Sequence, residues 1–89
     1  MPYIKQSERL VFDELLDPFL DYIRRERDNL TPGQLNYIIT RLCLVWVNKV
    51  SYSEYNKLIG VLECVKQELY RRTVAKYEDE KIKENGDLF

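Results

Sequence analysis

The chain has 89 residues, a formal net charge of −1, 45% hydrophobic residues and 33% charged residues. Such values are typical of one small folded domain and not of a disordered chain. Without a basic excess, non-specific DNA binding is disfavoured. The chain has no histidine, three glycines and three prolines. It therefore lacks the commonest metal ligand and general base, and few turn residues favour helices over a turn-rich β fold.

We predict one all-α domain over residues 1–89, with residues 1–6 as a lead-in and 86–89 as a tail. In the N-terminal part, Ser7 is expected to cap a short helix, SERLVFDELL, which is followed by a break at Asp17-Pro18. Aspartate is a good N-cap and proline is favoured at the first helical position. A second helix is therefore predicted from Pro18 to about Asp28.

A third helix is predicted from Pro32 to about Lys49, with Thr31 as its N-cap. Every residue from Leu42 to Val47 is apolar, so this helix should be buried on more than one side. The β-branched residues also permit a strand here, although the upstream cap and the spacing favour a helix. One long partner helix cannot cover the whole circumference in so short a chain, which predicts a homo-oligomer.

The longest predicted helix runs from Ser53 to Asn85, with Ser53 as its N-cap and Asn85-Gly86 as its stop. One side carries an apolar stripe with helical spacing, formed by Leu58, Leu62, Val65 and Leu69.

The opposite face of this helix includes Asn56, Gly60, Glu63 and Tyr70. Gly60 costs the helix about 1 kcal/mol relative to alanine. Close approach of a partner chain or a ligand would explain it. The alternative is neutral substitution or a tight contact inside the monomer.

Cys43 and Cys64 lie within helical apolar runs, so we expect both to be free, buried thiols in a reducing cytoplasm. No window of about 20 apolar residues spans a bilayer, and no signal peptide precedes the domain. The expected location is the cytoplasm, without membrane attachment.

The clearest chemical signal is a tyrosine beside two arginines, Tyr70-Arg71-Arg72, with Lys66 one turn upstream. A tyrosine ring can stack on a nucleobase and guanidinium groups can form forked contacts with phosphate. A solvated face of mixed charge is an equally good interpretation, because acidic residues interleave. The candidate ligand-binding residues are Tyr37, Asn56, Gly60, Glu63, Lys66, Tyr70, Arg71 and Arg72.

No pattern of nucleophile, base or metal ligands points to catalysis. The chain is therefore predicted to be no enzyme, with no catalytic residues, no metal site and no cofactor. A carboxylate-only metal site shared between subunits remains an alternative.

Three segments, GQLNYIIT, YNKLIGVLECVKQELYRR and YEDEKIKENGD, follow the opening MPYI. Together they resemble a family of short uncharacterised helical proteins of bacteria, prophages and phages. The most specific parts are the Ile-Gly-Val-Leu-Glu helix and the Asn-Gly-Asp end. In that family a proline often precedes the Tyr-Glu pair, whereas this chain has Lys76 there.

The resemblance implies a phage or prophage setting, which would place the protein in the cytoplasm of the host cell. The first functional hypothesis is therefore an oligomeric binding protein that sequesters a nucleotide-like immune signal at subunit interfaces, an anti-defence function. Its partners would be copies of itself and a small nucleotide-like ligand. The alternative is an interaction module that inhibits or adapts a host protein.

Overall fold

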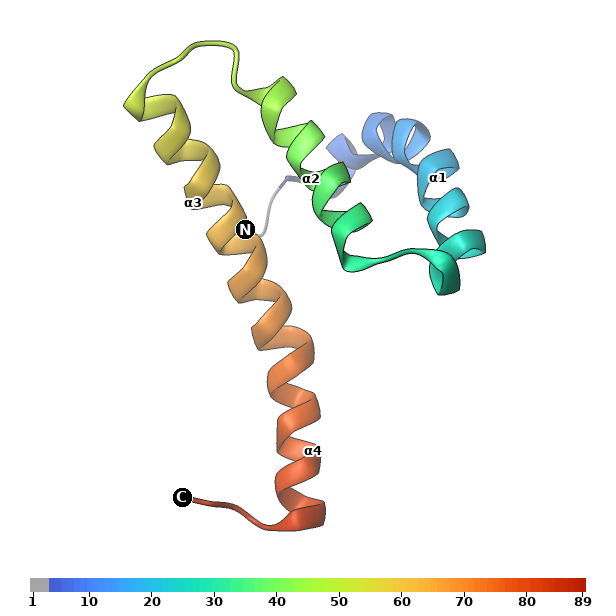
Figure 1. Ribbon diagram of the computed structural model, residues 1–89, viewed down its shortest axis with the longest axis vertical. Helices are drawn as coiled ribbons and strands as arrows, with labels where there is room; N and C mark the ends of the chain where they lie inside the picture. The colour runs from blue at the N-terminus through green and yellow to red at the C-terminus, as the bar shows by residue number, and fades with distance from the viewer. Residues whose placement is uncertain (1–3) are drawn as a thin grey trace. The chain divides into compact units, whose positions relative to one another are not determined.

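The computed structural model describes residues 4–89, and every regular element in this range is a helix (Figure 1). The predicted all-α class is therefore confirmed, while the predicted homo-oligomer remains a prediction. The α-helices are α1 (Arg9–Glu26), α2 (Pro32–Trp46), α3 (Tyr52–Leu69) and α4 (Ala75–Asn85). Two 3₁₀ turns, η1 (Gln6–Glu8) and η2 (Arg27–Asn29), and one π-helical turn, η3 (Tyr70–Val74), complete the order.

The chain divides into two units, Met1–Ile39 and Thr40–Phe89. The first unit contains η1, α1, η2 and the start of α2. The second contains the end of α2 and the long helical run of α3, η3 and α4. Each unit is described by itself below.

The predicted break at Asp17-Pro18 is wrong, because α1 continues through it as one helix of 18 residues with Pro18 inside. Proline removes one backbone hydrogen bond and its ring crowds the carbonyl of Glu14, four residues earlier. That carbonyl lies on a helix whose residues are largely exposed, so water can take the place of the lost donor. The N-terminal half therefore contains one helix where two were predicted.

The start of α2 is as predicted, whereas its end is not. The Thr31 hydroxyl accepts a hydrogen bond from Gln34 N at 3.2 Å, and the Gln34 side chain accepts one from Thr31 N at 2.8 Å. This reciprocal pair is a capping box, which satisfies two backbone donors at once. The helix ends at Trp46 and not near Lys49.

The N-cap of α3 is Ser51 and not Ser53. The Ser51 backbone is extended, and its hydroxyl accepts a hydrogen bond from Glu54 N at 3.2 Å. Both serines have the right chemistry, but only the one with non-helical backbone angles can cap. The predicted stop is confirmed, because α4 ends at Asn85 and Gly86 adopts a φ of 87°. That angle is unfavourable for residues with a Cβ.

The predicted single helix contains a widened turn. The N–H of Ala75 donates to the carbonyl of Tyr70, five residues earlier, where an α-helix would use the residue four earlier. The flanking residues Leu69 and Ala75 keep helical angles. The helix is thus continuous from α3 through η3 to α4, and the turn at η3 contains one residue more than a regular α-helical turn.

No side chain among residues 4–89 is buried. Leu58 and Leu62 of the predicted apolar stripe are half-buried, whereas Val65 and Leu69 are 44% and 58% exposed. Exposure is greater still in the apolar run of α2, where Trp46 is 67% exposed. In the single described chain this run is exposed, because too few elements within Thr40–Phe89 cover it. Its burial by other copies of the chain remains a prediction.

Burial of the two cysteines was also predicted incorrectly. Both are free, but Cys43 is only half-buried and Cys64 is exposed. Cys64 lies on α3, away from the most covered residues, Leu58 and Leu62.

Candidate functional site

The predicted Tyr70-Arg71-Arg72 cluster lies on the π-helical turn η3. Nη2 of Arg71 lies 3.1 Å from both carboxylate oxygens of Glu68, and Nε of Arg72 lies 2.7 Å from one of them. Two guanidinium groups therefore share one carboxylate. These three side chains together carry one net positive charge.

Glu68 holds this cluster together. Its side chain is 24% exposed, whereas those of Arg71 and Arg72 are 69% and 59% exposed. The hydrogen bond from Arg71 lowers the pKa of the Glu68 carboxyl, and the positive charges of both arginines lower it further. At neutral pH the carboxylate is ionised, and it orients both arginines along the helix.

Tyr70 extends the cluster toward α4. Its hydroxyl lies 3.1 Å from each carboxylate oxygen of Glu78 and donates one shared hydrogen. This hydrogen bond and the negative charge of Glu78 raise the pKa of Tyr70. The phenol therefore remains protonated through the neutral range, and half of its surface is exposed.

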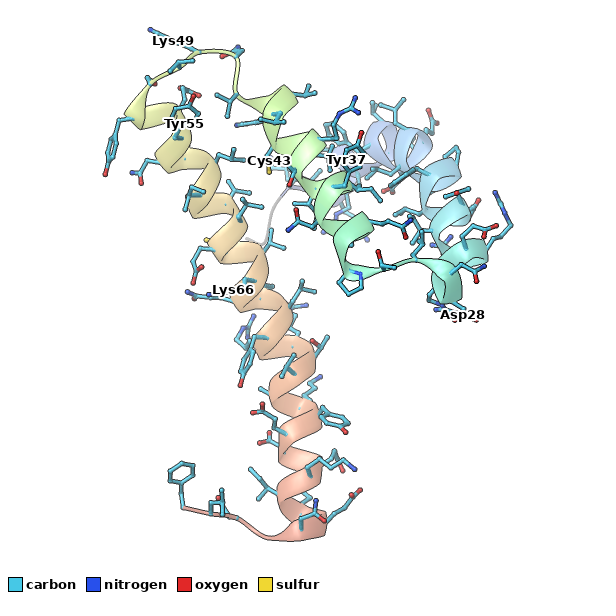
Figure 2. The ribbon with its side chains drawn as sticks, in the orientation of Figure 1. Asp28, Tyr37, Cys43, Lys49, Tyr55 and Lys66 are labelled. Atoms are coloured by element: carbon cyan, nitrogen blue, oxygen red, sulfur yellow. The ribbon has the colours of Figure 1, made fainter. Side chains whose placement is uncertain are left out.

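One turn upstream, Lys66 is paired with an acid. Lys66 is labelled on α3 in Figure 2. Its Nζ lies 3.0 Å from Oε1 of Glu63, which also accepts a hydrogen bond from Gln67 at 3.1 Å. The bond from Gln67 lowers the pKa of Glu63, with Lys66 as the second cause. Lys66 and Glu63 therefore form a locally neutral pair beside the cluster.

The remaining predicted ligand-binding residues are less informative. Asn56 and Gly60 lie on α3, and a Cβ placed at Gly60 would meet nothing within 4 Å. Within the Thr40–Phe89 unit Gly60 therefore makes no tight contact, whereas a partner contact remains a prediction. Tyr37 lies on α2 within the Met1–Ile39 unit, outside the unit that holds the others.

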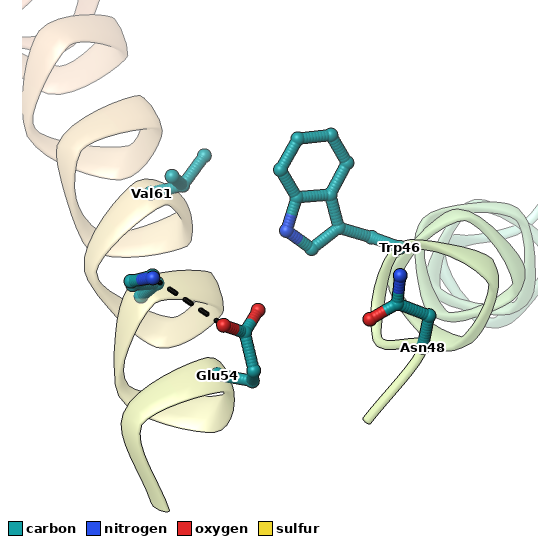
Figure 3. A pocket seen from close by; sticks show the side chains of 5 residues that line it. Trp46, Asn48, Glu54 and Val61 are labelled. Carbon is teal, nitrogen blue, oxygen red and sulfur yellow. Dashed lines mark hydrogen bonds and ion pairs between the residues drawn. The ribbon is translucent and has the colours of Figure 1, made fainter. Parts of the chain in front are cut away.

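A separate hollow lies within the Thr40–Phe89 unit, where the end of α2 faces the start of α3. Its volume is about 500 Å³. Figure 3 shows the Trp46 ring directed toward Val61, with Glu54 and Asn48 at the lower side. The Lys57–Glu54 ion pair closes one wall at 3.3 Å. The residues that line this hollow are Trp46, Asn48, Glu54, Lys57 and Val61.

Sequence reasoning missed two residues that organise the cluster, Glu68 and Glu78. The spacing of Glu68 to Arg71 and Arg72, three and four residues, could have identified the first, because such positions are neighbours on a helix. Nothing in the spacing pointed to Glu78, because its contact with Tyr70 depends on the widened turn. The hollow at Trp46 was missed as well, since none of its five lining residues had been selected.

Among residues 4–89, no three cysteine or acidic side chains are placed to hold a metal ion. None of the helices in the same range is both long enough and apolar enough to cross a bilayer.

Comparison with known proteins gives a family. Residues 1–88 match the family described as "Domain of unknown function (DUF6899)". No curated protein and no solved structure matches the chain. Because the match covers nearly the whole sequence, the chain belongs to the DUF6899 family.

Proposed function

We propose that this protein is a small self-assembling helical binding protein, and that it holds a nucleotide-like anion through Tyr70, Arg71 and Arg72 at the interface between subunits. The observation that carries the proposal is the sharing of one carboxylate, Glu68, by two guanidinium groups on a π-helical turn. Turns of this kind are rare and are frequent at functional sites.

The arginines retain donors for a ligand. The contacts with Glu68 use Nη2 of Arg71 and Nε of Arg72, whereas a guanidinium has N–H donors on all three nitrogens. A phosphate could therefore bind on the outer side of the pair without displacing Glu68. The exposed ring of Tyr70 offers a stacking surface for a base beside it.

Self-assembly is supported by the lack of burial. A chain with 45% hydrophobic residues and no buried side chain among residues 4–89 exposes far more apolar surface than isolated soluble proteins usually do. Other copies of the chain would cover that surface and enclose the ligand between subunits.

The resemblance to phage and prophage proteins supports a setting for this binding. In that setting the ligand would be a nucleotide signal of the host immune response, and holding it in the host cytoplasm would be an anti-defence function. No catalytic group is needed for such a role, since sequestration requires affinity only.

The test is isothermal titration calorimetry against a panel of linear and cyclic nucleotides, with inorganic phosphate as the reference. We expect at least one nucleotide to bind at least tenfold tighter than phosphate. Arg71→Ala or Arg72→Ala should weaken it at least tenfold. The matched control is Arg24→Ala, because Arg24 is also paired with a nearby acid, Asp21, but lies in the other unit. A flat response across the panel would contradict the proposal.

A second candidate function is binding of a host protein, and the exposed aromatic residues of the second unit favour it. Trp46 and Tyr52 are 67% and 85% exposed, and tryptophan and tyrosine are enriched at protein interfaces. If the protein binds a host protein, calorimetry should detect no nucleotide binding, and a defined host protein should co-purify with the wild type. Trp46→Ala should then reduce that co-purification, whereas Arg71→Ala should not.

A further inference from the structure

The π-helical turn changes which residues continue the apolar stripe of α3. Leu58, Leu62, Val65 and Leu69 recur at steps of four, three and four residues along one side of the helix. Their exposure increases toward the C-terminus, because Leu58 and Leu62 are half-buried whereas Leu69 is 58% exposed. The stripe thus leaves the covered part of the unit just where η3 begins.

In an uninterrupted α-helix the stripe would continue onto charged residues. The same spacing after Leu69 leads to Arg72, Lys76, Asp79 and Lys83. The extra residue in η3 rotates every later residue by about 100° about the helix axis, which is equivalent to a shift of one sequence position. The continuing positions become Thr73 and Tyr77, with Val74 beside Thr73, so the apolar stripe is extended by about two turns.

Two side-chain contacts agree with this shift. Thr73 donates its side-chain hydroxyl to the carbonyl of Leu69, so its polar group is bonded to its own backbone. At the far end Lys81 Nζ lies 5.5 Å from the centre of the Tyr77 ring and 3.1 Å from Glu84. The extended stripe therefore ends at Tyr77, where charged side chains take over.

Nothing within the second unit accounts for this extension. The main contacts of α4 are with η3, the element next to it in the sequence. A π turn is a rarely adopted conformation. A widened turn that aligns apolar residues is therefore best explained by something that packs along them.

We propose that the segment from Leu62 to Tyr77 pairs with the same segment of a second copy in antiparallel orientation, about a two-fold axis beside Leu69 and Tyr70. This inference rests on the self-assembly in the proposed function and specifies its geometry. About such an axis, Leu62 faces Tyr77 of the second copy and Val65 faces Val74. Apolar positions therefore meet at these two pairs, on both sides of the axis.

The charges select the second copy and the antiparallel orientation. About this axis, Glu68 of one copy lies opposite Arg71 of the other, next to Arg72. In a parallel pair Glu68 would face Glu68 and Arg71 would face Arg71, and repulsion between like charges would disfavour it. The antiparallel pair also places four guanidinium groups around two carboxylates, which makes the anion site incomplete without the second copy.

The test combines mass measurement with site-specific crosslinking in a Cys43→Ser, Cys64→Ser background. Leu69→Cys lies beside the proposed axis, so a short thiol crosslinker should give covalent dimers. Val65→Cys is the matched control, because in the antiparallel pair its two copies lie about 13 Å apart along the axis, at about 1.5 Å per residue. Val65→Cys alone should remain uncrosslinked, whereas a mixture with Val74→Cys protein should crosslink.

The outcomes separate this geometry from the broader proposal. Efficient crosslinking of Val65→Cys to itself would show a parallel pair and overturn the antiparallel one. An assembled mass without crosslinking at Leu69 would overturn the pairing and leave self-assembly standing, and a monomeric mass would overturn both. Because Leu69→Cys could weaken the assembly, Arg71→Glu provides a second readout. It should raise the dissociation constant at least tenfold, and Glu68→Arg combined with Arg71→Glu should restore it.

Discussion

The phenolic oxygen of Tyr70 lies 3.1 Å from both carboxylate oxygens of Glu78, although the two residues are eight apart in the chain. In a regular α-helix residues eight apart are about 80° out of line. The extra residue in η3 removes most of that offset. The hydrogen bond is therefore a direct result of the widened turn, and it can be used to monitor the turn in solution.

The first prediction uses the titration of Tyr70. The bond to Glu78 raises the pKa of Tyr70, so the phenol should ionise above the ordinary value of about 10. Glu78→Gln should return the Tyr70 pKa toward that value. The measurement is phenolate absorbance against pH, with Tyr70→Phe subtracted to isolate the one residue. Because the folded-state pKa is raised, the stabilisation is complete below pH 10 or so and is lost as pH rises through the folded-state value.

A second prediction concerns Glu68. Its pKa is lowered in the folded state, first by the hydrogen bond from Arg71, so its stabilising contribution is present above the unfolded-state value and disappears as pH falls through the folded-state value. Glu68→Gln should lower the melting temperature by on the order of 1–3 °C at pH 7. The difference should vanish in acid. Persistence of the same difference at low pH would show that packing, and not charge, is responsible.

The N-cap of α3 gives a third prediction with a matched control. Ser51→Ala removes the hydroxyl that accepts from Glu54 N, and should cost about 1 kcal/mol. Ser53→Ala lies inside the helix, where alanine is the better residue, and should be neutral or slightly stabilising. Urea denaturation of both variants measures the difference. A larger cost at Ser53 would reinstate the cap predicted from the sequence.

Pro18 provides a fourth prediction. It lies inside α1, where proline costs up to about 3 kcal/mol relative to alanine, so Pro18→Ala should raise helix content and the free energy of unfolding. Asp17→Ala distinguishes the alternatives. If the chain broke at this point Asp17 would act as an N-cap, and its removal would cost about 1 kcal/mol. In the continuous helix its removal should cost nothing.

Gly60 gives the fifth prediction. Since a Cβ at this position meets nothing within 4 Å, Gly60→Ala should stabilise α3 by about 1 kcal/mol in dilute, unassembled protein. If a partner chain presses on Gly60 in the assembly, the same substitution should lower the assembled mass at high concentration. Sedimentation measured at both concentrations separates these effects. An increase in stability at both would show that no partner lies against Gly60.

The parts of the fold that the sequence predicted are those set by local chemistry. Thr31 with Pro32, and Asn85 with Gly86, fix their helix ends through hydrogen bonds or backbone angles within a few residues. The Asp17-Pro18 break failed because a strong local preference was outweighed by the helical residues on both sides. Ser51 and Ser53 differ only in backbone angle, which the sequence does not report.

The candidate site was predictable only as far as helical spacing holds. Arg71 and Arg72 were selected because they follow Tyr70 in the chain, and their shared acid, Glu68, could have been identified from helical spacing. Beyond Leu69 any prediction from a constant period of 3.6 residues fails, because one widened turn rotates all that follows. The contact between Tyr70 and Glu78 therefore lay outside what periodicity can show.

The turn at Tyr70–Val74 also makes the long helix sensitive to length in an uncommon way. Deleting a single residue there would leave composition and charge almost unchanged. It would nevertheless rotate Tyr77 by about 100° about the helix axis. In homologues, gain or loss of one residue at this point would rotate α4 relative to α3 about the helix axis. Such a change would redirect the distal surface without any substitution in it.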